Sequence, residues 1–137
     1  MKQILDTNAL SSLLKGDPRA VSRIEKLRPG DVEVPQPVIA EIEYGIARLP
    51  RSRRRSRLEK RFAVIAGEMG RAPWSDEVSR AFGAIKVDLE SKGEVIEDFD
   101  VAIAAHAAAS DAVLVTADRS HMSRIEGLAI RDWTAED

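Results

Sequence analysis

Near its start the sequence reads Lys2-Gln3-Ile4-Leu5-Asp6-Thr7-Asn8, and this segment indicates the type of fold. Residues 2–5 predict a short buried strand that Asp6 ends, and Thr7 or Asn8 is expected to cap a helix running to about Lys15. Further along the chain, the sequence pattern predicts strands at 32–34, 112–116 and 128–130 and a short extended piece at 72–74. Helices are expected from Pro18, from Pro37 to about Leu49, through the next stretch to Met69, and over 76–93, 98–110 and 120–126.

Strands that alternate with helices predict an α/β fold with a short parallel sheet, here of four to five strands flanked by about six or seven helices. The 137 residues fit a single domain spanning 1–137, which can bury roughly two-thirds of its extended-chain surface. An apolar content of 44% and a charged content of 32% exclude a disordered chain. No apolar run approaches the ~18 residues of a membrane span, and residues 1–6 leave no room for a secretory segment. We therefore expect a cytoplasmic protein without a membrane partner.

The cysteine and histidine content limits the metal chemistry that is available to the chain. There is no cysteine, which excludes disulfides and thiolate metal sites, and His106 and His121 are too few and too far apart for a typical zinc site. If a metal binds, carboxylate oxygens must hold it.

The formal charge of -2 hides a strongly basic block at residues 48–61. This block holds eight basic residues and one acid, Glu59, whereas the rest of the chain holds 13 basic and 22 acidic residues. Such a block is typical of a surface that binds nucleic acid or an acidic partner, and equally of a solvated helix face. The arginines that we single out as candidates for binding RNA or a partner are Arg51, Arg53, Arg54, Arg55 and Arg57.

Two acids follow predicted strands, where parallel sheets place their ligand sites. Asp6 directly follows the first strand, and Asp118 lies two residues beyond the strand at 112–116. Either side chain could instead cap a helix or form a turn.

Two further acids lie on predicted helices close to apolar faces. Glu41 is about 60° from Val38 around its helix, at the edge of the apolar stripe, and a carboxylate there is costly unless it is paired or metal-bound. Asp100 shares a face with Ile103 and Ala107, although an acid in a first turn also satisfies free backbone amides. Four such carboxylates suit a hard cation, Mg²⁺ or Mn²⁺, which would relieve their repulsion and activate water against a phosphodiester. This chemistry points to a nuclease.

Five segments, taken in order, resemble the motifs of PIN domains, and the length resembles VapC-type toxins of bacterial toxin–antitoxin pairs. The segments are Ile4-Leu5-Asp6-Thr7-Asn8, Val38-Ile39-Ala40-Glu41-Ile42-Glu43-Tyr44-Gly45, the stretch from Ile96 to Ala107, Leu114-Val115-Thr116-Ala117-Asp118 and the ending from Ile125 to Trp133. Met122 departs from the pattern, because an aromatic residue is common there, and Asp118 stands where relatives often have Asn.

The resemblance implies a site and an activity. Asp6 and Asp100 would be the principal Mg²⁺ ligands, Mn²⁺ being an alternative, and Glu41 and Asp118 would complete the four-carboxylate catalytic site. Thr7, Asn8 and Thr116 would orient these carboxylates from behind. Water activated by the metal would then hydrolyse a phosphodiester in structured RNA, often tRNA or ribosomal RNA. His106 is expected to be a packing or surface residue.

The resemblance also implies partners. Such toxins are typically homodimers held by a cognate, VapB-like antitoxin, in some cases within a larger hetero-oligomer, and the antitoxin inserts a segment into the acidic groove. Two alternatives remain: a noncatalytic module of the same fold that binds RNA or a partner, and a nuclease that acts on DNA or in ribosomal RNA processing.

Overall fold

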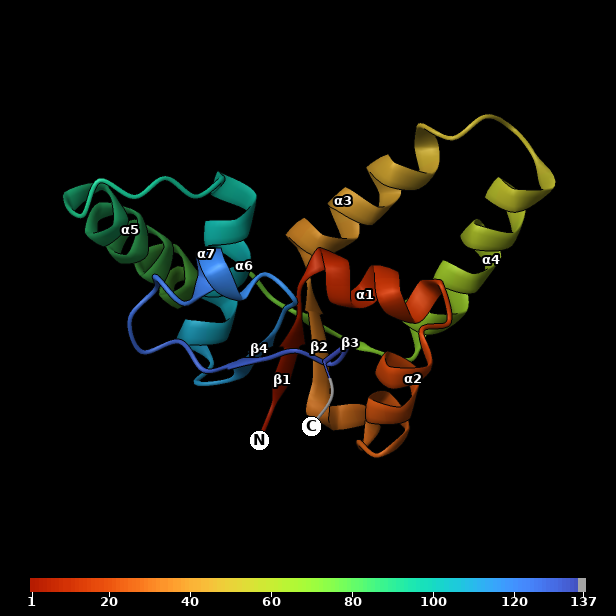
Figure 1. Cartoon of the computed structure of the whole chain (residues 1–137), viewed down its shortest axis with the longest axis horizontal. Coiled ribbons are helices and arrows are strands. Elements are labelled where there is room, and N and C mark those ends of the chain that lie inside the picture. The colour runs from red at the N-terminus through yellow and green to blue at the C-terminus, as the bar shows by residue number, and fades with distance from the viewer. Residues whose placement is uncertain (136–137) are drawn as a thin grey trace.

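A five-stranded parallel sheet forms the centre of the molecule, with the strand order β3-β2-β1-β4-β5. The computed structural model describes residues 1–135, and Figure 1 shows the arrangement. Within this range the elements are β1 (Gln3–Leu5), α1 (Thr7–Leu14), α2 (Pro18–Glu25), a 3₁₀ turn (Pro29–Asp31), β2 (Val32–Pro35), α3 (Gln36–Ala47), α4 (Arg53–Gly67), β3 (Gly70–Ala72), α5 (Asp76–Ser91), α6 (Asp98–Ala109), β4 (Val113–Val115), α7 (Arg119–Met122) and β5 (Ile130–Arg131). This architecture confirms the predicted α/β class and element numbers.

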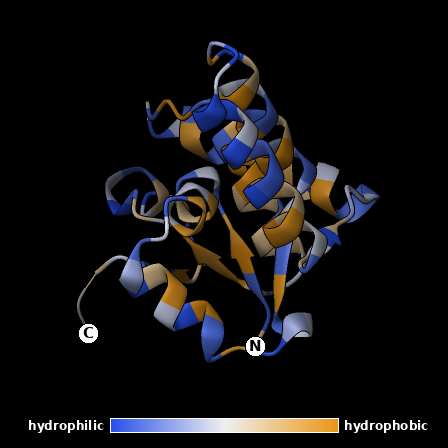
Figure 2. Ribbon diagram, turned by 90° about the vertical axis from the view of Figure 1, so that its right-hand side faces the viewer, coloured by the Kyte–Doolittle hydropathy of each residue, from blue (hydrophilic) through white to orange (hydrophobic). Residues whose placement is uncertain are grey.

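Strand β1 is the central strand and is buried along its whole length, as the opening stretch of the sequence predicts. Gln3 aligns with Val32 of β2 and with Val113 of β4, so the carboxyl ends of β1 and β4 meet at one edge of the sheet. Helix α6 packs on β1 and β4, while α1 packs against α2, α3 and α4. Figure 2 shows the hydrophobic strands enclosed between these helices. None of the helices within residues 1–135 combines the length and the apolar character needed to cross a lipid bilayer.

Helices α3 and α4 project from the sheet as a helical arm, on the side away from α5, α6 and α7 (Figure 1). The loop between the two helices contains Pro50, and Ser52 caps α4 by accepting a hydrogen bond from the Arg55 N–H at 3.2 Å. The basic block therefore lies at the outer end of this arm, over the loop and the first turns of α4.

The sequence misassigned one helix cap. Asp6, and not Thr7 or Asn8, caps α1: its backbone is extended and its Oδ1 accepts the Ala9 N–H at 2.8 Å. Strand β1 ends at Leu5, as predicted, and helix α1 begins at Thr7, so Asp6 between them takes the cap position. Asp98 lies inside the first turn of α6 and pairs with Lys86 at 2.9 Å.

Three element boundaries also differ from the prediction. Strand β3 covers 70–72 and not 72–74, because Pro73 has no N–H with which to continue the pairing to β2. Helix α7 ends at Met122, four residues before the expected end, and turns follow up to Gly127, whose φ is +75°. These turns delay the last strand, so that β5 begins at Ile130 and not at residue 128.

Candidate functional site

The carboxyl ends of β1 and β4 bring the predicted acids into one region. Asp6 follows β1 directly and donates its backbone N–H to the Val115 carbonyl of β4 at 3.0 Å. Asp118 follows β4, Glu41 projects from α3 and Asp100 lies in the first turn of α6. Their charges act on one another. The charges of Asp118 and Glu41 raise the pKa of Asp6, and those of Glu41, Asp118 and Asp6 raise the pKa of Asp100.

Asp6 is the most deeply buried of the four, with 5% of its surface exposed. Burial is the largest cause that raises its pKa above the ordinary value, because a charged carboxylate loses its hydration. Hydrogen bonds from the Thr116 hydroxyl and the Ala9 N–H oppose this shift and favour the charged form. The side chain is thus fixed on two sides and held in a poorly hydrated position.

Asp100 is partly buried, and no hydrogen bond is among the main causes of its pKa shift within the described residues. Burial is again the largest cause of its raised pKa, followed by the charges of Glu41, Asp118, Asp6 and Glu97, and each of these causes acts in the same direction. A carboxylate that only burial and like charges surround is stabilised most by an added positive charge.

Glu41 lies at the rim of the buried face of α3, as its helical position predicts, and Glu43 faces solvent. The Thr7 hydroxyl, at the start of α1, donates to Glu41 Oε1 at 2.5 Å. This contact joins two helices across the site and orients the Glu41 carboxylate.

Asp118 differs from the other acids, because several donors surround it and its pKa is lowered. Partial burial opposes that shift, but hydrogen bonds from the His121 side chain and backbone, the charge of His121 and the Ser120 hydroxyl outweigh it. Asp118 also caps the short helix α7 through the His121 N–H at 3.3 Å. Sequence reasoning missed His121, although a histidine three residues after a capping aspartate is within reach of it.

Thr116 connects two of the four acids from behind. Its side chain is 1% exposed, and its hydroxyl bonds to the Asp6 carboxylate while accepting the Asp118 N–H at 3.0 Å. Thr7 and Thr116 therefore contact the acids that they were expected to orient. Asn8 is exposed, and within residues 1–135 its side chain makes no hydrogen bond to any of the four carboxylates.

The donor chemistry fits a hard divalent cation. The four acids offer carboxylate oxygens only, which are the preferred ligands of Mg²⁺ and Mn²⁺, and two of them are desolvated and repelled by their neighbours. In the described part of the chain no three acidic or histidine side chains already surround a common point in metal-binding geometry. Binding an ion would therefore require the carboxylates to turn toward it from positions at which their charges already act on one another.

The profile of the PIN domain matches residues 4–128, which is most of the chain. The chain belongs to the PIN-domain family. It is 26% identical to Ribonuclease VapC2 of Rickettsia felis, over 97% of this chain and 98% of that protein. It is 31% identical to VapC ribonuclease Y4jK of Sinorhizobium fredii, over 85% of this chain and 87% of that protein. Among solved structures, VapBC2 of Rickettsia felis bound to promoter DNA aligns with a TM-score of 0.87 and 25% identity, over 97% of this chain and 99% of that one. The resemblance to VapC-type PIN domains is thus confirmed.

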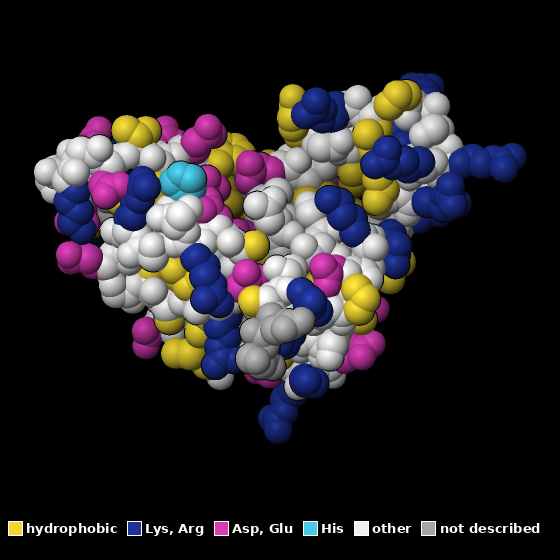
Figure 3. Space-filling view, in the orientation of Figure 1, with side chains coloured by type: hydrophobic (Ala, Val, Ile, Leu, Met, Phe, Trp, Pro, Cys, Tyr) yellow, Lys and Arg dark blue, Asp and Glu magenta, His cyan; other side chains and the backbone are white. Residues whose placement is uncertain are grey.

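The surface of this PIN domain separates acidic and basic regions. Figure 3 shows a notch between the α3–α4 arm and the lobe of α5, α6 and α7, with acidic side chains along it and Lys and Arg side chains over the outer part of the arm. Arg51, Arg53 and Arg54 are exposed there. Arg55 is instead tied to the arm, since it pairs with Glu59 at 2.8 Å and donates to the Leu49 carbonyl at 3.2 Å.

Arg57 is intermediate between these two groups. It is exposed, and its Nε donates to the Arg53 carbonyl at 3.4 Å, one turn earlier in α4. The five candidate arginines thus divide into exposed side chains at the tip, for which residues 1–135 show no ion pair, and side chains that contact the arm itself.

His106 and Met122 have structural positions in this PIN domain. His106 is 1% exposed, its Nδ1 lies 2.8 Å from the Ala102 carbonyl, and its ring meets Trp74 edge-on at 5.3 Å. This burial confirms the expected packing role of His106. Met122 is 2% exposed and fills the core position where an aromatic residue was expected.

Proposed function

We propose that this PIN domain is a Mg²⁺-dependent endoribonuclease that acts as the toxin of a type II toxin–antitoxin system. The observation that carries the proposal is a group of four interacting carboxylates, two that follow β1 and β4 and two from α3 and α6; burial, and then the charges of other acids in the group, raise the pKa of Asp6 and Asp100. A fold gains nothing from holding desolvated like charges together, and function is the usual reason for such an arrangement.

The chain's own residues divide the work. Asp6 and Asp100 are proposed as the principal ligands of the cation, as the resemblance to PIN domains implies, and they are the two acids whose pKa burial and neighbouring charges raise. Glu41 and Asp118 complete the site, and Thr7 and Thr116 hold their neighbouring carboxylates in place. A bound Mg²⁺ or Mn²⁺ supplies a Lewis acid that activates water and offsets the charge of a phosphodiester. Asn8, which is exposed beside Thr7, is proposed to help orient these carboxylates when the cation binds.

The names of the relatives support RNA as the substrate and an antitoxin as the partner. A protein of Salmonella typhimurium that is 27% identical, over 97% of this chain, is named tRNA(fMet)-specific endonuclease VapC. We infer that this chain also cuts structured RNA, of the tRNA or ribosomal RNA class. We further infer a VapB-like antitoxin, a homodimer that assembles with it into a larger hetero-oligomer, and action in the bacterial cytoplasm.

The exposed tip of the helical arm is proposed to hold the RNA backbone. Arg51, Arg53 and Arg54 have no acidic partner among the described residues, so their charge is available to phosphates. Arg57 can add to this surface, whereas Arg55 mainly stabilises the arm through Glu59. Residues rich in charge and without aromatic side chains suit backbone contacts better than base stacking.

Incubating the purified protein, free of antitoxin, with total cellular RNA tests the proposed function. Parallel reactions contain Mg²⁺, contain EDTA, or use the Asp6→Ala variant. Discrete fragments that require both Mg²⁺ and Asp6 support a metal-dependent ribonuclease, and mapping the fragment ends identifies the target. If a parallel binding assay shows that the protein binds RNA that it never cuts, the noncatalytic module is supported. If a parallel reaction with DNA gives the only cleavage, a deoxyribonuclease is supported.

A further inference from the structure

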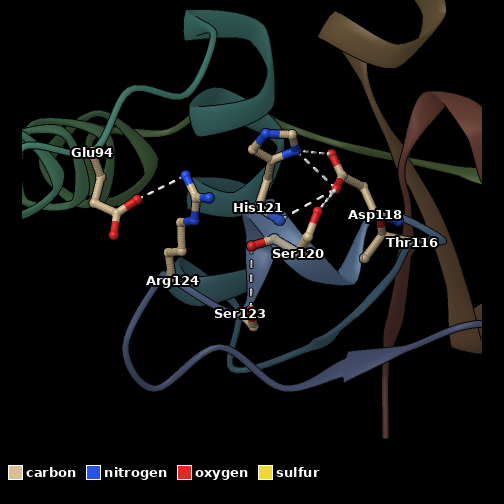
Figure 4. A network of polar contacts seen from close by, with 7 residues as sticks. All are labelled: Glu94, Thr116, Asp118, Ser120, His121, Ser123 and Arg124. Atoms are coloured by element: carbon tan, nitrogen blue, oxygen red, sulfur yellow. Dashed lines mark hydrogen bonds and ion pairs between the residues drawn. The ribbon is translucent and has the colours of Figure 1, made fainter.

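His121 contacts Asp118, a partly exposed acid of the site, through its ring. Its Nδ1 lies 2.9 Å from both carboxylate oxygens of Asp118, and Figure 4 shows the ring turned toward that carboxylate. A carboxylate accepts hydrogen bonds and does not donate them, so Nδ1 is the donor in this contact. A donor shared by two oxygens fixes both the position and the rotation of the carboxylate group.

The local fold explains why this contact forms. Asp118 precedes α7, a single turn of helix, and three residues bring the His121 side chain back over the start of that turn. The His121 backbone N–H donates to Oδ1 at 3.3 Å, and the Ser120 hydroxyl donates to the same atom at 3.2 Å. The ring is half exposed, and therefore the core does not depend on it.

The contact belongs to a chain of bonds that reaches the buried centre of the site. The Asp118 N–H donates to Thr116 Oγ1, and the Thr116 hydroxyl bonds to the Asp6 carboxylate. On the outer side, Arg124 pairs with Glu94 at 2.7 Å, which ties the turn after α7 to the segment between α5 and α6 (Figure 4). Asp118 is thus held on its inner side by the bond from its N–H to Thr116 and on its outer side by the His121 ring.

We propose that His121 is a positioning residue, which orients the Asp118 carboxylate for the divalent cation and thereby completes the four-carboxylate site. This proposal rests on the proposed function. A freely rotating surface carboxylate must lose rotational freedom when it binds an ion, and a side chain that already holds it removes part of that cost. The cap of α7 does not carry this role, because the backbone N–H of residue 121 remains in every substitution.

A pair of amide variants separates positioning by Nδ1 from a general effect of the side chain. In His121→Asn the amide nitrogen occupies the place of Nδ1, whereas in His121→Gln it lies one bond further out, near the place of Nε2. His121→Ala removes the donor. Ser123→Ala is the matched control, since Ser123 follows the same helical turn and, within residues 1–135, its hydroxyl bonds only to the Ser120 carbonyl.

Two readouts are measured for each variant: Mn²⁺ affinity of the metal-free protein by calorimetry, and the rate of RNA cleavage. We expect His121→Ala to weaken Mn²⁺ binding and cleavage by about tenfold or more, the usual cost of losing a residue that orients a metal ligand. His121→Asn should recover most of both values, His121→Gln should not, and Ser123→Ala should match the wild type. Circular dichroism verifies that each variant is folded.

The outcomes distinguish this inference from the proposed function. Wild-type affinity in His121→Ala, or equal recovery by His121→Asn and His121→Gln, would overturn the positioning role even if the wild type cleaves RNA. If the wild type binds Mn²⁺ and cleaves nothing, the proposed function fails, and the order of Mn²⁺ affinities still decides the role of His121.

Discussion

Thr116→Val tests whether the bonds behind the site hold the two acids as the structure indicates. The side chain is 1% exposed, and valine replaces the hydroxyl with a methyl group of similar size, so the substitution opens no cavity. It removes the bond to the Asp6 carboxylate and the bond from the Asp118 N–H. A bond to a charged group contributes about 1.5–3 kcal/mol and a neutral one about 1 kcal/mol, so the expected loss is about 2.5–4 kcal/mol.

Unfolding of the metal-free protein in EDTA, followed by circular dichroism, measures this loss. For a chain of this length the loss corresponds to a drop of about 10 °C in Tm. Thr116→Ser is the matched control, because it keeps both bonds and loses only a buried methyl group, at a cost of about 1 kcal/mol. Thr116→Val should therefore be clearly less stable than Thr116→Ser at neutral pH.

The pH dependence of the difference follows from the Asp6 bond. The Thr116 hydroxyl lowers the pKa of Asp6 and so stabilises its charged form, which means that this stabilisation is present at neutral pH and is lost as the pH falls through the pKa of Asp6. The gap between the two variants should narrow on acidification. If Thr116→Val is as stable as Thr116→Ser at neutral pH, these two bonds do not hold the site.

Two further predictions concern charge. Burial and neighbouring acids raise the pKa of Asp100, so its contribution to stability is present below the ordinary value of 3.8 and is lost as the pH rises through the raised pKa. Metal-free Asp100→Asn should therefore be more stable than the wild type at pH 7, by about 1 kcal/mol under water-like screening. In thermal unfolding at pH 3 the two proteins should be equally stable. Replacing Arg51, Arg53 and Arg54 with glutamine should weaken RNA binding in filter assays and reduce the slope of log affinity against log salt concentration by about one for each phosphate that is no longer neutralised. Arg55→Gln should mainly lower Tm. An unchanged slope in the triple variant would show that the arm is not part of the RNA interface.

The positions of the acids were predictable because they follow from regular geometry. Asp6 and Asp118 follow strands, and the parallel sheet places the ends of β1 and β4 side by side. The helical period likewise put Glu41 at the rim of a buried face and Glu43 in solvent. Such rules depend on repeats of two or 3.6 residues, which the sequence displays directly.

Features that depend on a single turn or on tertiary pairing were less predictable. Asp6 took the cap of α1 because β1 ends at Leu5, and the sequence alone left three adjacent polar residues as candidates. The return of His121 to Asp118 depends on the brief helix α7, whose length was overestimated. The Arg55 and Glu59 pair, four residues apart on α4, was open to prediction and shows which arginine of the basic block is not free.

Cleavage and binding of the same RNA by Asp100→Asn test whether the four carboxylates hold the cation that supports hydrolysis. The target fragment is first identified with the wild type, and its binding is then measured for both proteins in EDTA and its cleavage in Mg²⁺. If the four carboxylates hold the cation that supports hydrolysis, Asp100→Asn should bind the fragment as tightly as the wild type and fail to cut it. Cleavage by Asp100→Asn at the wild-type rate would show that the four carboxylates do not hold the cation in this way.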